Sequence, residues 1–418
     1  MKTLIVTQYF WPETFRINTV AEALHRAGCE VTVLTGQPNY PDGTIFKGYR
    51  AWRSDRELHP AGYEIFRVPL IPRGKKTALT LTLNYLSFLA SSILVGQWRL
   101  RKKEFDVVFV YGTSPVLQAL AGAFFSARKQ AALIVWVQDL WPESLSATGY
   151  VKNQRILCGV AGLVRWIYHR CDLLLVQSRS FVESTSAMAG EVPVVYYPNP
   201  GDVERTSQER PRNPVNLPSG FNVTFSGNLG TVQAVETIVE AAELLRNEPH
   251  INFVIIGSGS RLDWIQQETK RRALTNVHLL GRVEPEVAND AMARSDALLI
   301  TLKNVESLNK TVPSKLSTYF GIGRPVLACM DGEGAEIVRA SGAGITCEAE
   351  NAERLAALVL ELRSMPQEAR DEMGMAGRRW YEKHFELMQL TDVLVDHFKQ
   401  AMDGRNWKST KEAMEGGS

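Results

Sequence analysis

The most restrictive feature of the sequence is a repeated alternation of short apolar runs with longer segments of helical period. Clear examples of the short runs lie at 2–7, 29–36, 106–112 and 251–257. They are rich in β-branched residues and bounded by turn residues, which is typical of buried strands. Strands buried on both faces that alternate with helices predict doubly wound α/β domains with parallel sheets. A chain of 418 residues exceeds one typical core, so we expect two such domains.

Composition narrows the class of protein further. The net charge of +2 gives no basic field that would attract nucleic acid, so we expect no nucleic-acid partner. The five cysteines have neither CxxC nor metal-like spacing, which is typical of reduced packing residues in a cytosolic protein. The N-terminus passes directly into a strand and lacks the pattern of a signal peptide. The first strand–helix connection has no GxGxxG, which argues against a dinucleotide site there.

The strongest chemical signal lies in the stretch 304–336. A helix is expected to start at Pro313, since proline is favoured at the first helical position, and to end at Gly321 and Gly323. The apolar runs on both sides of this helix are expected to be parallel strands. The start of the helix then lies beyond the carboxyl ends of the strands, where doubly wound sheets bind ligands.

Basic residues surround this helix start. Lys310 and Lys315 lie on either side of Pro313, and Ser314 adds a hydroxyl group. The first N–H groups of a helix are open and carry the positive end of its dipole. With two ammonium groups nearby, they predict a site for a phosphate or diphosphate. The alternative is an ordinary strand–helix–strand unit whose lysines lie at the surface.

The motif that begins with PSKL at Pro313 and continues through GRPVLA to DGEGAE resembles the C-terminal donor half of glycosyltransferase family 4. This family is a retaining group with the GT-B fold, in which two doubly wound, Rossmann-like parallel-sheet domains face a cleft. The closer resemblance is to the branch that makes bacterial O-antigen and capsule, including N-acetyl-L-fucosamine transferases. The chain has Lys310 and Thr318 where most of the family carries two glutamates. Glu333 or Glu336 is therefore expected to bind the ribose and sugar hydroxyls.

The resemblance covers nearly the whole chain and implies how it is divided. Residues 1–200 are expected to form an N-terminal acceptor-binding domain. Residues 201–375 are expected to form the C-terminal nucleotide-sugar donor domain. The helices in 376–402 are expected to return to the N-terminal domain, as they commonly do in GT-B chains.

Further donor residues follow from the resemblance. Asn228, Leu229 and Gly230 resemble the family's donor-phosphate turn, and Gly257 in the next turn is expected to let the nucleobase or ribose approach. Relatives usually carry a basic residue in or just after the first turn, where this chain has a threonine and Gln233. The positive charge is therefore expected from other residues, with Lys303, Lys310, Lys315 and Arg282 as candidates.

The expected chemistry needs no cofactor. Nothing in the sequence resembles the DxD motif that holds a divalent metal, and glycosyl transfer needs no redox group. Lys315, Lys310 and Arg282 are expected to stabilise the charge that develops on the leaving diphosphate. No residue is an obvious covalent nucleophile. The resemblance therefore implies front-side attack, with the departing phosphate acting as the base.

Acceptor residues are expected beyond the carboxyl ends of the first strands. The candidates in the loop after the first strand and in the turn-rich loop 38–43 are Glu13, Arg16, Asn18 and Asn39. Asp139 follows the apolar run IVWV at the same edge. In family members this motif lines the acceptor side of the cleft. Alternatively, Asp139 caps the helix that begins near Pro142.

Residues 78–98 carry no charge and are long enough for a transmembrane helix. We reject a membrane span because the strands on its two sides must share one sheet. Read as a helix, the segment has a narrow polar stripe that includes Asn84 and Ser87. Basic residues flank it: Arg73, Lys75 and Lys76 before, and Arg99, Arg101, Lys102 and Lys103 after. It is either a buried crossover helix or a helix that rests partly in the interface of an anionic membrane, and we expect the second.

Together these features predict a retaining glycosyltransferase in O-antigen or capsular polysaccharide synthesis. It is expected to move a sugar, N-acetyl-L-fucosamine in the closer branch, from a UDP-sugar to an undecaprenyl-diphosphate-linked acceptor. We expect a cytoplasmic protein, peripheral on the inner face of the cytoplasmic membrane. Two alternatives remain. One is a nucleotide-sugar 2-epimerase of the same fold, and the other is a degenerate transferase that acts as an assembly partner, as the missing glutamates suggest.

Overall fold

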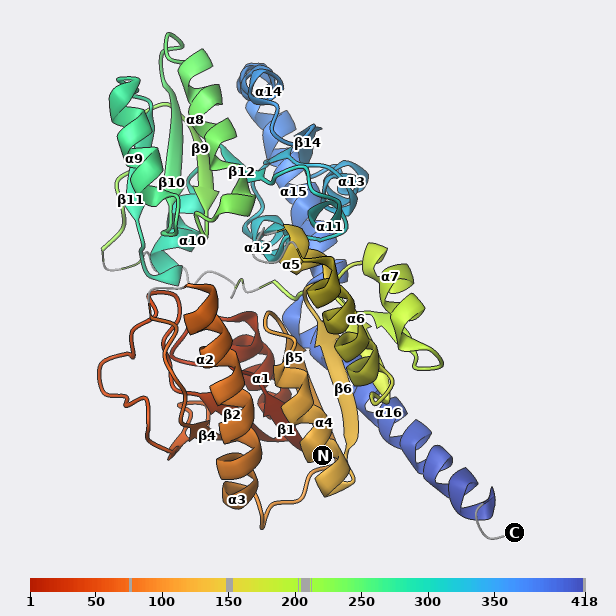
Figure 1. The fold of residues 1–418 in the computed structure, drawn as a ribbon. Helices are drawn as coiled ribbons and strands as arrows, with labels where there is room; N and C mark the ends of the chain where they lie inside the picture. The colour runs from red at the N-terminus through yellow and green to blue at the C-terminus, as the bar shows by residue number, and fades with distance from the viewer. Residues whose placement is uncertain (75–76, 148–152, 202, 204–210, 212, 416–418) are drawn as a thin grey trace. The chain divides into compact units, whose positions relative to one another are not determined.

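The computed structural model describes residues 1–74, 77–147, 153–201, 203, 211 and 213–415 (Figure 1). The chain forms two compact units. The first comprises Met1–Pro198 and Leu387–Ser418, and the second comprises Asn199–Glu386. Each unit has a sheet dominated by parallel strands with helices on both faces, so the predicted doubly wound α/β architecture is confirmed.

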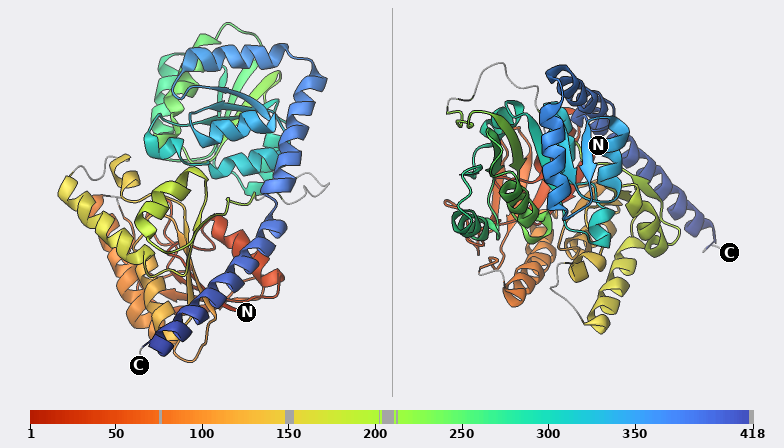
Figure 2. Two further views of the ribbon diagram at one scale, coloured as in Figure 1. Left: turned by 90° about the vertical axis from the view of Figure 1, so that its right-hand side faces the viewer. Right: turned by 90° about the horizontal axis from the view of Figure 1, so that it is seen from above.

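The boundary near the C-terminus differs from the sequence prediction. Residues 376–386 belong to the second unit, because helix α15 (Gln367–His384) packs along α12 (Ser314–Ile322). The approach is close, since a Cβ on Gly377 would lie 3.1 Å from the Cβ of Ala343. Helix α16 (Leu387–Glu415) returns to the first unit and lies beside α1 in the left view of Figure 2.

The first unit is built on an eight-stranded sheet. Its strands are β1 (Lys2–Val6), β2 (Glu30–Gly36), β3 (Asp55–Leu58), β4 (Glu64–Val68), β5 (Val107–Gly112), β6 (Ala132–Val137), β7 (Leu173–Val176) and β8 (Val194–Tyr196). They lie in the order β3-β4-β2-β1-β5-β6-β7-β8. Neighbours are parallel except for the antiparallel pair of β3 and β4.

Helices cover both faces of this sheet. They are α1 (Arg16–Arg26), α2 (Ala78–Ser91), a π-helical turn η1 (Ser92–Gly96), α3 (Gln97–Arg99), α4 (Gln118–Lys129), α5 (Glu143–Ala147), α6 (Gln154–Tyr168), α7 (Ser180–Ala189) and α16. Helices α2, α4, α6 and α7 contribute to the core on one face, and α1 and α16 to the core on the other.

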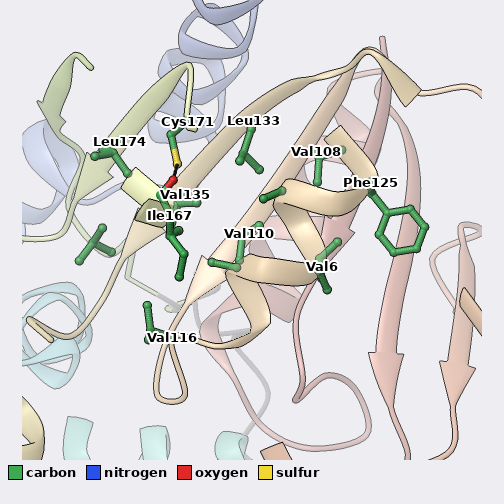
Figure 3. Close-up of a cluster of buried hydrophobic side chains, with 14 of the residues drawn as sticks. Val6, Val108, Val110, Val116, Phe125, Leu133, Val135, Ile167, Cys171 and Leu174 are labelled. Atoms are coloured by element: carbon green, nitrogen blue, oxygen red, sulfur yellow. Dashed lines mark hydrogen bonds between the residues drawn. The ribbon is translucent and has the colours of Figure 1, made fainter. Parts of the chain in front are cut away.

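The two cores explain why the strands are uninterrupted apolar runs. Successive side chains of a strand point to opposite faces of the sheet. Val108 and Val110 of β5 pack with Val135 and Leu174 in the cluster shown in Figure 3. Phe109, between the two valines, joins the cluster on the opposite face. Both faces of β5 are buried, so its side chains do not alternate between apolar and charged.

The second unit is built on a six-stranded, fully parallel sheet in the order β11-β10-β9-β12-β13-β14. The strands are β9 (Phe221–Ser226), β10 (Ile251–Ile256), β11 (Val277–Gly281), β12 (Ala297–Thr301), β13 (Val326–Cys329) and β14 (Gly344–Cys347). The helices are the 3₁₀ turn η2 (Thr231–Gln233), α8 (Val235–Leu244), α9 (Leu262–Arg271), α10 (Pro285–Ala293), α11 (Glu306–Asn309), α12, α13 (Glu333–Ser341), α14 (Ala352–Ser364) and α15.

Helix α12 differs from its prediction at both ends. Pro313 is the extended N-cap, with ψ of 127°, and the helix starts one residue later at Ser314. Gly323 ends the helix in the left-handed region, with φ of 78°, as predicted. Gly321 lies inside the helix instead, where a Cβ would come within 2.6 Å of the Val203 side chain. This glycine is needed for close packing rather than for termination.

The uncharged segment 78–98 is helical throughout, and its polar stripe faces the protein. Strands β4 and β5 on its two sides belong to the same sheet, as the argument against a membrane span required. Asn84 is fully buried, accepts a bond from Gln8 Nε2 at 2.7 Å and donates to the carbonyl of Ile71 at 2.6 Å. The Ser87 hydroxyl accepts from the Ile71 N–H at 2.9 Å. The helix therefore packs on the first unit through its polar side.

The outer side of this helix is apolar. Five large side chains are exposed on it: Leu79, Leu83, Leu86, Leu94 and Trp98. Helix Ala78–Arg99 is long and apolar enough to span a membrane, and only 22% of its most apolar window is buried. The first unit therefore covers one side of this helix and leaves the other side exposed. Lys75 and Lys76, two of its predicted basic flanking residues, lie outside the described residues.

Candidate functional site

Two glycine turns meet beyond the carboxyl ends of β9 and β10 in the second unit. A Cβ on Gly257 would lie 1.9 Å from the carbonyl oxygen of Gly227, so a side chain there would prevent this backbone contact. Leu229 is buried, and its N–H donates to the Ser258 carbonyl at 2.9 Å. Asn228 is exposed, with its amide nitrogen 2.9 Å from where a Cβ on Gly230 would lie. The predicted donor turns thus form one continuous backbone surface.

Helix α12 is anchored to this surface by Tyr319. The Tyr319 hydroxyl is buried and accepts a hydrogen bond from the Ser226 N–H at 2.8 Å. It also lies 3.2 Å from the Ser226 carbonyl and 3.4 Å from that of Leu299, to which it can donate. These bonds join the helix to the end of β9 and to the middle of β12. The first turn of α12 is thereby fixed next to the turn that follows β9.

Lys315, in that first turn, points its ammonium into a small enclosure. The Nζ atom lies 3.7 Å from the centroid of the Phe225 ring and donates to Gln233 Oε1 at 2.9 Å. A Cβ on Gly227 would lie 3.4 Å from the same Nζ. The ammonium is therefore held between an aromatic face, one amide oxygen and the first glycine turn.

The electrostatics of this enclosure favour an anionic ligand. Burial lowers the pKa of Lys315 to about 7. No carboxylate pairs with Lys315 in the part of the chain that the structure describes, and a buried charge without an ion partner is costly. The open N–H groups at the start of α12 add positive potential at the same place. A diphosphate would supply the missing negative charge.

Sequence reasoning missed two residues of this enclosure. The sequence indicated Gln233 only as a residue that replaces a basic one, and no role was predicted for Tyr319. Gln233 is positioned by the end of β12, since the Thr301 hydroxyl donates to its carbonyl at 2.5 Å. The Lys303 N–H donates to the carbonyl of the preceding residue, Val232, at 3.0 Å, which places Lys303 beside η2. Tyr319 could have been found, because it follows Lys315 by four positions on one helical face.

Lys310, Ser314 and Arg282 lie in different surroundings. Lys310 pairs with Glu306 at 3.0 Å, because helix α11 forms where the sequence predicted a loop and sets the two residues one turn apart. Ser314 is exposed at the first position of α12. Arg282 is exposed after the edge strand β11, which lies two strands, or about 10 Å, from β9.

The two carboxylates expected to replace the missing glutamates also differ. Glu333 is buried at the start of α13, whereas Glu336 is exposed one turn later. The preceding Gly332 has φ of 78°, and a Cβ there would lie 1.8 Å from the carbonyl oxygen of Asn309. The segment before α12 therefore packs directly on the turn that carries Glu333.

In the first unit, Asp139 lies at the carboxyl end of the sheet and does not cap the following helix. Its Oδ2 accepts from the Ser114 N–H at 2.9 Å and from the Ser114 hydroxyl at 3.0 Å. The Trp141 indole donates to the same hydroxyl at 3.1 Å. Burial raises the pKa of Asp139, against the effect of the Ser114 bonds. Burial also raises the pKa of Tyr111; the charge of Arg16 opposes this shift and that of Asp139 adds to it.

The remaining acceptor candidates connect loops. Glu13 is buried, and its Oε1 accepts the N–H groups of Asn39 and Tyr40, each at 2.7 Å. Its Oε2 accepts the Phe10 N–H at 3.1 Å. Burial raises the pKa of Glu13 to about 7, although these three bonds oppose the shift. Asn18 donates to the Glu13 carbonyl at 2.7 Å. Glu13, Asn18 and Asn39 thus fix the loops after β1 and β2 to each other.

Comparisons with known proteins agree with this geometry. Residues 14–200 match the family described as glycosyl transferase 4-like domain, and residues 220–364 match glycosyl transferases group 1. Over 340 residues the chain is 26% identical to the putative colanic acid biosynthesis glycosyl transferase WcaI of Escherichia coli (strain K12). That alignment covers 77% of this chain and 82% of WcaI.

Solved structures show the same fold at low identity. Sucrose-phosphate synthase from Thermosynechococcus elongatus aligns with a TM-score of 0.73 and 15% identity, over 96% of this chain and 98% of its own. HepE from Anabaena in complex with UDP aligns with a TM-score of 0.66 and 14% identity, over 96% of this chain and 100% of its own. Each unit therefore matches a glycosyl transferase domain, and these matches together with the shared fold support a glycosyltransferase with the GT-B fold.

Proposed function

We propose that the chain transfers a sugar, with retention of configuration, from a UDP-sugar to a lipid-linked acceptor in the synthesis of a bacterial surface polysaccharide. The carrying observation is the Lys315 ammonium, which is half-buried beside two glycine turns and has no carboxylate partner among the described residues. WcaI, named for colanic acid biosynthesis, and HepE, solved with UDP, support this choice. From the resemblance of the stretch 304–336 we propose N-acetyl-L-fucosamine as the sugar and undecaprenyl diphosphate as the lipid carrier of the acceptor.

In this proposal the donor diphosphate lies against the glycine turns and the start of α12. As the bond between the sugar C1 and the diphosphate breaks, negative charge grows on the phosphate oxygens. Lys315 stabilises that charge more strongly than it stabilises the bound donor, which lowers the barrier. The acceptor oxygen bonds to C1 from the same face, and its proton passes to the departing phosphate. In the first unit, Asp139 is the proposed contact of the acceptor hydroxyl.

We further propose that the protein is peripheral on the inner face of the cytoplasmic membrane. The exposed apolar face of the 78–99 helix supports this placement. Near its end, the guanidinium carbons of Arg99 and Arg101 lie 5.3 and 4.8 Å from the ring centroid of Trp98. An apolar face with an exposed tryptophan and arginines suits the interface of an anionic membrane. A lipid-linked acceptor would be reached from that position.

The donor site is tested by nucleotide binding and by turnover. In thermal-shift measurements with UDP, GDP, dTDP, CMP and ADP, we expect the largest stabilisation by UDP. A nucleotide at 100 times its Kd adds about 2.7 kcal/mol, enough for a clear shift. Lys315→Ala should lower kcat by about 10²-fold, with a smaller loss of donor affinity, and Lys315→Arg should recover part of it. Lys270→Ala, on the exposed surface of α9, is the matched control and should keep wild-type kcat.

Three results would contradict parts of the proposal. A preference for GDP would remove the assignment to the fucosamine branch. Lys315→Ala that keeps at least half of the wild-type kcat would place the diphosphate elsewhere. Release of a free or epimerised sugar without any acceptor would favour the 2-epimerase instead of a transferase.

A further inference from the structure

An aromatic cluster lies beyond the carboxyl ends of β1 and β2 in the first unit. It consists of Tyr9, Phe15 and Tyr40. The Tyr9 and Phe15 rings are stacked with centroids 5.3 Å apart, and the Tyr40 centroid lies 5.5 Å from Tyr9 and 5.0 Å from Phe15. The carboxylate of Glu13 fixes these loops through the N–H groups of Asn39 and Tyr40. Tyr9 is buried, and Phe15 and Tyr40 are half-buried, so the cluster is a fixed support at the ligand-binding edge of the sheet.

Arg73 brings a positive charge to this cluster. Its guanidinium carbon lies 5.5 Å from the Tyr9 ring centroid and 5.0 Å from that of Tyr40. Its Nη1 donates to the Tyr9 hydroxyl at 3.2 Å, and its main-chain N–H donates to Asn39 Oδ1 at 3.1 Å. The next residue, Gly74, packs so closely on Gly43 that a Cβ on Gly43 would lie 2.3 Å from the Gly74 carbonyl oxygen. The position of Arg73 is therefore set from both sides.

Unlike its neighbour Arg67, Arg73 is not saturated by the protein. The fully buried Arg67 donates to Glu57 and to the carbonyls of Gly36 and Trp11. The Nε of Arg73 is buried and has no acceptor, and no carboxylate lies within ion-pair distance of it among the described residues. Guanidinium groups with open N–H donors bind phosphate groups well, because the planar fork matches phosphate oxygens.

The place of Arg73 in the chain connects this charge to the membrane. Helix α2 starts at Ala78, five residues after Arg73, and its exposed apolar face starts with Leu79 and Leu83. A helix that lies in the membrane interface keeps its end at the depth of the lipid headgroups. Arg73 would then lie at the level where the phosphates of membrane lipids are found.

We propose that Arg73, held in place by the rings of Tyr9 and Tyr40, binds the diphosphate of the polyprenyl-linked acceptor. The inference rests on the proposed lipid-linked acceptor and names the site that recognises its phosphate end. Glu13 forms no ion pair with Arg73, and its two oxygens instead accept main-chain N–H groups of the loops. The site is separate from the Lys315 enclosure, which belongs to the donor unit. Arg73 recognises the acceptor, while the apolar face of α2 holds the protein on the lipid surface.

The test measures binding of the full-length protein to phosphatidylcholine vesicles in two arms. One set of vesicles contains undecaprenyl diphosphate, and the other contains phosphatidylglycerol at equal surface charge. Arg73→Gln should weaken binding to the first set by about tenfold, the worth of a charge-assisted hydrogen bond, and should not change binding to the second. Arg101→Gln, which changes the arginine beside Trp98, should weaken binding to both sets equally. Arg73→Lys should keep part of the diphosphate preference.

An equal loss of Arg73→Gln on both vesicle types would assign Arg73 to general headgroup binding and overturn the proposal. If Arg73→Gln binds both vesicle types as the wild type does but has a lower melting temperature, Arg73 only stabilises the aromatic cluster, and the proposal is wrong. UDP binding at the Lys315 enclosure, measured by thermal shift on the same variants, separates this inference from the proposed function. If UDP does not bind but Arg73→Gln still loses the diphosphate preference, the proposed donor site fails and the lipid-phosphate site remains.

Discussion

UDP binding should require the uptake of a proton by Lys315. The ammonium is half-buried beside Phe225 and Gln233, and its pKa is lowered to about 7. A bound diphosphate would place negative charge next to it and return the pKa toward its ordinary value of 10.5. The ligand therefore selects the protonated form. Above pH 7 an increasing share of the free protein must first be protonated.

The size of the effect follows from that pKa. Half of the free molecules carry the proton at pH 7, and about one in a hundred at pH 9. UDP affinity should therefore fall by about 50-fold between these two pH values, with proton uptake rising from about 0.5 to about 1 per UDP bound. The terminal phosphate of UDP titrates near pH 6, so its own protonation contributes little in this range.

Isothermal titration calorimetry in pairs of buffers with different ionisation enthalpies measures both quantities. Lys315→Met should remove the pH dependence along with much of the affinity, and the exposed control Lys270→Met should leave both unchanged. The unliganded protein offers a second readout, because a lysine with a lowered pKa costs stability when it is charged. Unfolding free energy should therefore rise from pH 7 toward pH 10 in the wild type more than in Lys315→Met. Equal UDP affinity at pH 7 and pH 9 would refute the reasoning.

Two further predictions concern the first unit. Burial raises the pKa of Glu13 from 4.5 to about 7, so the folded state holds this proton more tightly than the unfolded chain does. Its contribution to unfolding free energy is fully present below pH 4.5 and is lost as the pH rises through 7, by up to about 3 kcal/mol. Urea denaturation should show this slope in the wild type and a flatter one in Glu13→Gln. Asp139→Asn should lower transfer by about 10²-fold with UDP affinity unchanged. Its melting temperature should change little, because the amide oxygen can still accept from Ser114; a large drop would indicate a structural role.

The strands and the Lys315 helix could be predicted because their signals are local. A strand buried on both faces, such as Val107–Gly112, consists of consecutive apolar residues whatever lies next to it. The place of Lys315 in the first turn of a helix could be predicted from Pro313 and the glycines around it. Gln233 could not, because it lies 82 residues from Lys315 in the sequence and meets it only through the pairing of β9 with β12.

The burial of carboxylates was harder to predict for the same reason. Glu13 was expected to meet an acceptor because it follows the first strand. The structure gives both of its oxygens to main-chain N–H groups, two of them 26 and 27 residues away. A loop whose N–H groups have no partner in a strand or helix must find another acceptor when it is buried. Which side chain supplies that acceptor depends on how two loops meet, and local sequence does not specify this.

The 78–99 helix shows most clearly why a periodic pattern does not determine its own orientation. A polar stripe on an apolar helix is usually expected to face water. Here the side-chain amide of Gln8 and the main-chain groups of Ile71 need hydrogen-bond partners at the edge of the sheet. Asn84 bonds to the Gln8 amide and the Ile71 carbonyl, and Ser87 bonds to the Ile71 N–H. The polar side is therefore inside, and the leucines are left on the outer face. The informative feature of the sequence was that neither face of the helix carries a charged residue. An ordinary surface helix would have charged residues on the face that meets water. This exposed apolar face, with two arginines beside Trp98, is the observation on which the proposed membrane contact rests.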